Sequence, residues 1–311
     1  MRRAILVTGL ILGSFVLVNA QRGRNPAPAP PPGDPPLINS ERQTNINERS
    51  KDLRMTEKFP VHTTVNSHVF RENIRPLYRN SKKEERELLA PDAADAEKYA
   101  AFLNQKNTGL IKLVADQGCD EKFNVIVSSP HCQKYTMPGA GSTYSFREDD
   151  YRMRSLGDIF FTGDILQNMG KLVNGIFVDI GDVPLEQVGP ETGGVKYLAN
   201  IEPASDLDAI NSFNEKLAEG IEDGEFTYRS FVRFAENRTY ALRSIAYRGN
   251  IYRTVQGMTY DEMEFDKRRD LTIAFRVVRI NPEEKTLTIL WKTLAEQKSP
   301  KIDTRDTSDQ H

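Results

Sequence analysis

The chain has 311 residues, of which 28% are charged, and its formal net charge at pH 7 is −2. Positive and negative charges nearly cancel, so the composition gives no reason to expect binding to nucleic acid or to an anionic membrane. The length is sufficient for one large domain or two small ones, each with a hydrophobic core of useful size.

The first twenty residues have the pattern of an export signal. Arg2 and Arg3 precede an apolar run over residues 4–18, and Ala20 stands where a signal peptidase would cut. The alternatives are an uncleaved membrane anchor and a buried helix, but the run is shorter than the ~20 residues that cross a bilayer. A bacterial lipid anchor needs a cysteine at the cut, and the first cysteine is Cys119. We therefore expect a cleaved signal peptide over 1–20, a periplasmic or extracellular location and no stable membrane insertion after cleavage.

Residues 21–90 are expected to form a Pro-rich and charged disordered arm. Seven prolines between positions 26 and 36 favour extended polyproline II geometry. Residues 37–90 carry many charged and polar side chains and few apolar ones, so this stretch is expected to be disordered or draped over the folded part. The mixed-sign run at 82–87 is typical of a solvated helical turn, or else of a contact with an envelope polymer or a protein partner.

Residues 91–200 are expected to form an α+β region. Asp92 is a typical N-cap residue, and apolar residues recur at helical spacing as far as position 104. Short strands are expected at 110–114 and 123–127. Alternating and β-branched runs between Gly-Asp and Asn-Gly turns then predict an antiparallel meander, with clear members at 143–147, 158–161 and 175–180.

Cys119 and Cys132 are the only two cysteines. In a chain exported to an oxidising compartment, an even count with short spacing favours a disulfide. Such a bond would contribute about 3 kcal/mol by the loop-entropy relation. The alternative is that Cys132 is a nucleophile and His131 its base.

Residues 201–298 are expected to contain a second helix followed by β-strands. Ser205 is the expected N-cap, Asp208 occupies the capping-box position and Gly220 ends the helix. Alternation predicts strands at 226–234, 239–247 and 251–255, and a hairpin of 270–280 with 286–294. Residues 299–311 are expected to be a flexible tail.

Together these elements predict an α+β fold, rich in antiparallel sheet, with two main amphipathic helices and a preceding disordered N-terminal arm. Residues 91–200 and 201–298 form either one domain or two abutting domains with a seam near Glu202.

Arginines and tyrosines alternate along the predicted strands of the last third. On one sheet face they would suit an envelope polymer or a protein partner, because both residue types are enriched in binding hot spots. The alternative is a solvated face on which arginine packs against tyrosine and glutamate. The candidate binding residues are Arg229, Tyr240, Arg243, Tyr247, Arg248, Tyr252 and Arg253.

Aspartates stand near the ends of several predicted strands. Ca²⁺ takes roughly six to eight oxygen ligands from such loops, and two close carboxylates can act as acid and base on a glycoside. No segment has the spacing of a regular Ca²⁺ loop, and Asp beside Gly is also typical of β-turns. The candidate metal ligands are Asp158, Asp164, Asp179 and Asp182.

Histidine is scarce, with four residues in the whole chain. A zinc hydrolase or a Ser-His-Asp enzyme would depend almost entirely on His131. No Gly-x-Ser-x-Gly or His-Glu-x-x-His segment occurs. We therefore expect no catalytic residues and a non-enzymatic binding or scaffold protein of the cell envelope or extracellular space. The alternative is a carboxylate- or metal-dependent hydrolase that acts on a polymer.

Overall fold

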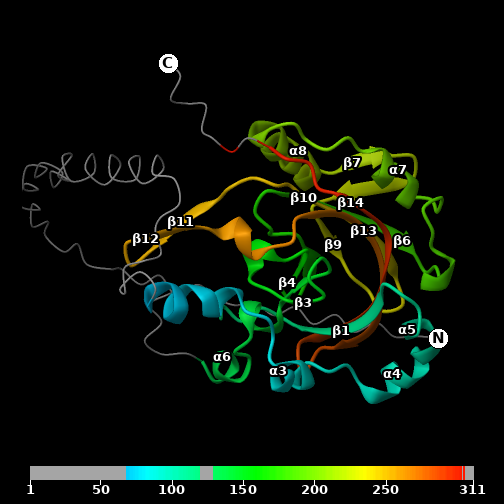
Figure 1. Cartoon of the computed structure of the whole chain (residues 1–311). Coiled ribbons are helices and arrows are strands. Elements are labelled where there is room, and N and C mark those ends of the chain that lie inside the picture. The colour runs from blue at the N-terminus through cyan, green and yellow to red at the C-terminus, as the bar shows by residue number, and fades with distance from the viewer. Residues whose placement is uncertain (1–67, 120–128, 303, 305–311) are drawn as a thin grey trace, which may run out of the picture. The chain divides into compact units, whose positions relative to one another are not determined.

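The computed structural model describes residues 68–119, 129–302 and 304. The expected signal peptide, the Pro-rich stretch and the expected strand at 123–127 lie outside these residues. The described part has an α+β fold dominated by antiparallel sheet, as the sequence predicts (Figure 1). None of its helices is long and apolar enough to cross a membrane.

A seven-stranded antiparallel sheet forms the centre of the fold. Its strand order is β1-β14-β13-β10-β6-β8-β7, so strands from both sides of Glu202 share one sheet. The strands are β1 (Thr108–Val114), β6 (Val173–Gly181), β7 (Ile221–Asp223), β8 (Phe226–Arg229), β10 (Thr239–Ala246), β13 (Arg269–Asn281) and β14 (Thr286–Lys298).

A second antiparallel sheet has five short strands in the order β3-β2-β4-β5-β9. They are β2 (Thr143–Ser145), β3 (Asp150–Tyr151), β4 (Ile159–Phe161), β5 (Ile165–Gln167) and β9 (Phe231–Arg233). Strands β11 (Tyr252–Val255) and β12 (Met258–Asp261) form a separate hairpin, which extends to the left of the sheets in Figure 1.

The helices are short apart from one. They are α3 (Lys83–Leu88), α4 (Ala93–Lys98), α5 (Ala100–Leu103), α6 (Pro130–Lys134), α7 (Val195–Asn200) and α8 (Leu207–Glu219). Single turns of 3-10 or π type occur at η1 (Phe70–Ile74), η2 (Arg75–Tyr78), η3 (Pro138–Gly141), η4 (Arg154–Leu156), η5 (Leu185–Gln187) and η6 (Glu262–Phe265).

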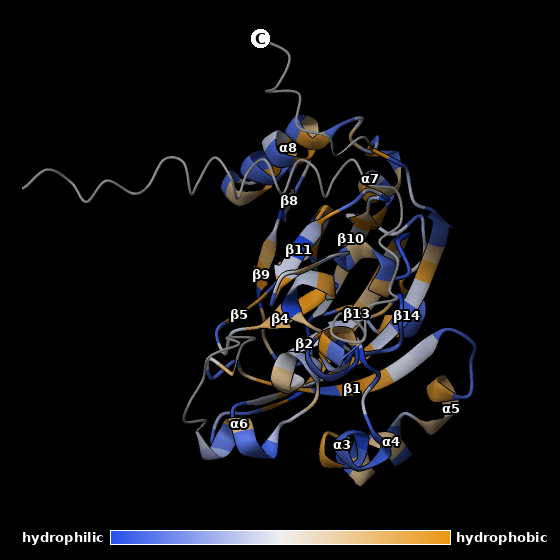
Figure 2. Ribbon diagram, turned by 60° about the vertical axis from the view of Figure 1, so that its left-hand side comes forward, coloured by the Kyte–Doolittle hydropathy of each residue, from blue (hydrophilic) through white to orange (hydrophobic). Residues whose placement is uncertain are grey.

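Both expected helices form, with differences at their ends. Asp92 caps α4 by accepting a hydrogen bond from the Ala94 N–H, but a break at Tyr99 separates α4 from α5. The N-cap of α8 is Asp206 and not the predicted Ser205, since the Asp206 carboxylate accepts from the Ala209 N–H at 2.8 Å. Figure 2 shows both hydrophilic and hydrophobic residues along α8, as expected for a helix with one packed face.

The hairpin of β13 and β14 is confirmed and is the longest strand pair of the sheet. The Glu284 N–H donates to the Asn281 side-chain oxygen at 3.0 Å and closes the polar turn that the sequence predicts. Ile273 and Phe275 of β13 belong to one buried cluster, while Ala274 between them belongs to the cluster on the opposite face of the sheet.

Both faces of the central strands are covered. Ile176 and Val178 of β6 belong to one buried cluster, while Phe177 between them belongs to a second cluster on the opposite face. Every residue of β10, the middle strand of the seven, is buried. A polar side chain on β10 therefore needs a partner inside the protein.

The chain packs onto these sheets earlier than composition suggests. The predicted arm extends to residue 90, whereas residues 68–90 form η1, η2 and α3 and bury Val69, Ile74 and Tyr78. The tail also packs in its first residues, since Ser299 and Ile302 are buried and the Ile302 N–H donates to the carbonyl of Arg248. Residues 68–90 thus lie against the folded part, which was one of the two alternatives for this stretch, and are not disordered.

Candidate functional site

The predicted Arg and Tyr strands supply interior residues and not one binding face. Tyr240 and Tyr247 are 0% exposed and Arg243 is 4% exposed. The Arg243 guanidinium donates to both carboxylate oxygens of Asp270, at 3.0 and 2.7 Å, and to two backbone carbonyls. The structure does not place these three residues on a binding face: Tyr240 and Arg243 lie on β10, which is covered on both faces, and the buried Tyr247 directly follows it.

Tyr247 has a structural role of the same kind. Its hydroxyl donates to the Asn174 side-chain oxygen at 2.7 Å and accepts from the Ala204 N–H at 2.8 Å. Burial raises the pKa of Tyr247 to about 12, so the hydroxyl stays protonated at any ordinary pH.

The other four candidate binding residues are dispersed. Arg229 lies half-buried beside Gly220, and the Arg248 Nε donates to the Ser299 carbonyl at 2.9 Å. Arg253 pairs with a buried glutamate on η6, while Tyr252, its neighbour on β11, is 59% exposed. Of the seven predicted residues, Tyr252 is the one with a large exposed aromatic surface.

The four predicted metal-ligand aspartates do not converge. Asp158 is buried against Arg147, Asp179 pairs with Arg238, and Asp182 pairs with Arg276. Asp164 is exposed in the turn between β4 and β5. Among the described residues, no group of three or more His, Cys, Asp or Glu side chains is placed to hold a metal ion. The placement of these four residues therefore gives no support to the alternative of a calcium site.

A buried ion-pair network joins the two sheets, and sequence reasoning missed it. Arg147 pairs with Asp158 and Asp266, and all three side chains are at most 1% exposed. Ser244 of β10 donates to the Asp158 carboxylate, and Arg268 pairs with Asp266 at 2.7 Å. Although burial acts to raise the pKa of Asp266, the two arginines hold it below its usual value. These groups are fully engaged with one another, which indicates a structural role.

A cavity of ligand size, with a volume of about 350 Å³, opens on the described surface. We call it the loop cavity. It lies where four segments distant in sequence come together: the end of β1, the β4–β5 turn, the end of β9 and the β13–β14 turn. Its lining residues are Ala115, Gln117, Phe161, Thr162, Gly163, Asp164, Phe234, Ile280, Asn281, Pro282, Lys285 and Thr286.

Backbone hydrogen bonds fix the walls of the loop cavity. The Ala115 N–H donates to the Lys285 carbonyl at 2.8 Å, and the Asp116 N–H donates to the Phe161 carbonyl at 3.0 Å. The rings of Phe161 and Phe234 contact each other edge to face, with centroids 5.4 Å apart. The cavity thus has a preformed shape, which ligand sites typically have.

The charged residues of the loop cavity lack ionic partners. Asp164 and Lys285 are both exposed, and in the described part of the chain neither has an oppositely charged group within 4.0 Å. This sets them apart from Asp158, Asp179 and Asp182, which are all paired.

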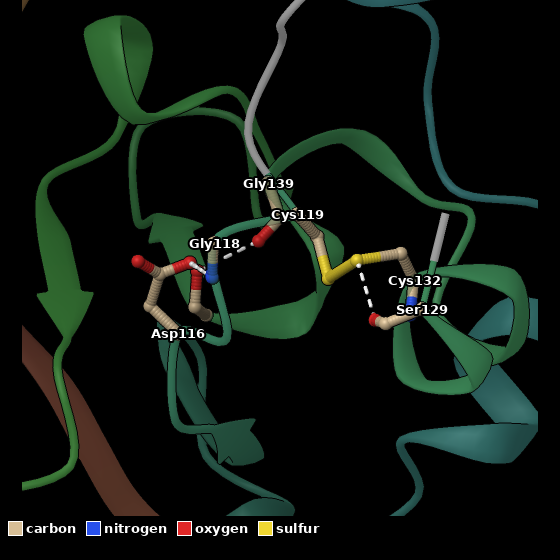
Figure 3. The surroundings of a disulfide bond; sticks show 7 residues. Asp116, Gly118, Cys119, Ser129, Cys132 and Gly139 are labelled. Carbon is tan, nitrogen blue, oxygen red and sulfur yellow. Dashed lines mark hydrogen bonds between the residues drawn. A yellow bond between two sulfur atoms is a disulfide. The ribbon is translucent and has the colours of Figure 1, made fainter. Parts of the chain in front are cut away.

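The predicted disulfide between Cys119 and Cys132 is confirmed, with Cα atoms 5.2 Å apart (Figure 3). It ties the segment that follows β1 to α6, two residues beyond the cavity residue Gln117. The Ser129 hydroxyl accepts from the Cys132 N–H at the start of α6. A bridged sulfur is not nucleophilic, so the alternative of a Cys132 nucleophile does not apply to this form.

His131 is also poorly placed to act as a base. Burial and the charge of Lys134 lower its pKa, and its Nε2 atom is buried without a hydrogen-bond partner among the described residues.

No family model, no curated protein and no solved structure matches this chain.

Proposed function

We propose that this protein is an exported, non-enzymatic binding protein that works in the periplasm or outside the cell and takes a small ligand into the loop cavity. The observation that carries the proposal is the cavity itself. Its volume of about 350 Å³ lies within the range of about 300–1,000 Å³ typical of ligand pockets. Its lining combines apolar residues with a few polar and charged ones, the usual composition of such sites.

Export is supported by two independent features. The first twenty residues have the charged start, apolar run and end of a secretory signal. The disulfide between Cys119 and Cys132 is of a kind that persists in oxidising compartments. Intact mass of the secreted protein tests this part: we expect a chain that begins at Gln21 and is two hydrogens lighter than its reduced form. Retention of residues 1–20, or free thiols, would contradict it.

The alternative of a carboxylate- or metal-dependent hydrolase is not carried by a specific observation. Asp158, Asp179 and Asp182 pair with three different arginines. Binding is therefore assigned to the loop cavity and not to the Arg and Tyr strands or the strand-end aspartates.

Retention of small molecules tests the binding proposal while the ligand is unidentified. The secreted protein is equilibrated with the small-molecule fraction of its own cells and growth medium, washed by ultrafiltration, and its bound compounds are identified by mass spectrometry. The same is done with Gln117→Trp, which places a bulky ring on an exposed part of the cavity lining. Glu283→Trp is the matched control, because Glu283 is exposed in the β13–β14 turn but does not line the cavity.

We expect at least one compound to be retained by the wild type and by Glu283→Trp and to be lost in Gln117→Trp. Retention of no compound by the wild type, or equal retention by both tryptophan variants, would contradict the proposal.

A further inference from the structure

The lining of the loop cavity indicates which class of ligand it binds, and this inference rests on the proposed function. We propose that the cavity binds a zwitterionic amino acid or dipeptide with a bulky apolar side chain. The ligand carboxylate would pair with Lys285, its ammonium with Asp164, and its apolar side chain would pack on Phe234 and Ile280.

The apolar part of the lining supports the side-chain assignment. Phe161, Phe234, Ile280, Ala115 and Pro282 all line the cavity. Phe234 and Ile280 are only half-buried in the protein, so apolar surface remains for a ligand to cover. Removing apolar area from water is favourable in proportion to the area buried.

The charges of the lining support the zwitterion. Asp164 and Lys285 have opposite signs, come from two different turns and are both without an ionic partner in the residues that the structure describes. A ligand with only one charge would pair with only one of the two lining charges. A ligand that carries both an ammonium and a carboxylate complements both, and hydrogen bonds to charged groups are the stronger ones.

Lys285 is the last residue of the β13–β14 turn, directly before β14. Its φ is 53°, in the left-handed region, where hairpin loops ordinarily place glycine or asparagine. Its carbonyl accepts the hydrogen bond from Ala115, which fixes the residue at the cavity.

The test is calorimetric titration of the full secreted chain with three probes: phenylalanyl-leucine, its C-terminal amide and its N-acetyl derivative. We expect the free dipeptide to bind and each blocked form to bind about tenfold more weakly, as expected for the loss of one charged hydrogen bond. Lys285→Gly should lower affinity for the free dipeptide about tenfold and remove the preference for the acid over the amide. Asp164→Asn should likewise remove the preference for the free amine over the N-acetyl form.

Folding is controlled for in the same variants. Because glycine suits the left-handed backbone at this position, Lys285→Gly is expected to keep the Tm or to raise it by about 2 °C. Lys171→Met, at an exposed lysine outside the lining, should leave all three affinities unchanged.

Two results would overturn the inference. One is the absence of binding heat for all three probes. The other is equal binding of free and blocked dipeptides that is lost in Gln117→Trp, which would refute the zwitterion while leaving the proposed binding function intact. A failure of the proposed function itself would show in the retention experiment, where no compound would distinguish the wild type from Gln117→Trp.

Discussion

Replacing Glu85 by glutamine would remove a carboxylate that organises part of residues 68–90 and links it to Thr136. Glu85 lies on α3 and is 6% exposed. Its two oxygens accept from the Arg79 guanidinium at 2.7 and 2.6 Å, from the Thr136 hydroxyl at 2.8 Å and from the Lys82 N–H at 2.7 Å. These donors, chiefly Arg79, lower the pKa of Glu85 from the ordinary 4.5 to about 2.

The pKa gives the size of the expected effect. A tenfold change in proton affinity corresponds to about 1.4 kcal/mol, so the ionised carboxylate contributes about 3 kcal/mol at neutral pH. Because the folded-state pKa of Glu85 is lowered, this contribution is complete above pH 4.5 and is lost as the pH falls toward 2. Glutamine keeps one accepting oxygen, so we expect Glu85→Gln to lower the free energy of unfolding by about 2–3 kcal/mol at pH 7.

The free energy of unfolding of the wild type and of Glu85→Gln is measured by urea unfolding at several pH values between 7 and 2.5. The fluorescence of Trp291, the only tryptophan, reports unfolding. The difference between wild type and Glu85→Gln should shrink as the pH falls below 4.5. Glu84→Gln is the matched control, since Glu84 is exposed on the same helix. The reasoning is refuted if the two variants lose equal stability, or if the Glu85→Gln difference does not depend on pH.

Two further substitutions test the interior of the fold. Asp158→Asn removes one of the two carboxylates that pair with the buried Arg147 and is expected to cost about 3 kcal/mol in urea unfolding. Asp182→Asn, at an aspartate that is 73% exposed, should cost less than about 1 kcal/mol, and similar losses for the two variants would argue against the buried network. Gly109→Ala places a Cβ atom 2.5 Å from the Trp291 ring and should cost about 1–3 kcal/mol, while Gly189→Ala, with open space around it, should be nearly neutral. An unchanged Tm for Gly109→Ala would contradict the close packing of β1 on β14.

Local patterns were sufficient for most strands and for the disulfide. The β13–β14 hairpin follows from its alternating residues and its Asn-Pro turn, and the bond between Cys119 and Cys132 follows from their count and spacing. Both features depend on residues close in sequence, where propensity and loop entropy act directly.

The burial of β10 could not be predicted in this way. Alternation indicates a strand but does not say whether one or both of its faces are covered. Arg243 therefore resembled a surface residue. Its partner Asp270 lies on the neighbouring strand β13, opposite Ile245 and 27 residues further along the chain. The same limit applies to residues 68–90, where Tyr78 donates to Glu262, a residue 184 positions away.

The loop cavity was beyond sequence reasoning for a related reason. The turns at Gly163 and Pro282 have turn-forming residues, but nothing local indicates that they meet each other or the ends of β1 and β9. Sheet topology brings them together, because β4, β9 and the β13–β14 hairpin end near the extension of β1.

The central claim is that the loop cavity binds a small ligand. A crystal structure of the secreted protein tests it most directly, provided that the protein is purified from its own cells without any step that removes bound ligands. We expect electron density for a small organic molecule in the loop cavity, in contact with Phe234 and Ile280 and close to Lys285. Two results together would contradict the binding proposal: a loop cavity that holds only water, and equal retention of small molecules by the wild type and by Gln117→Trp.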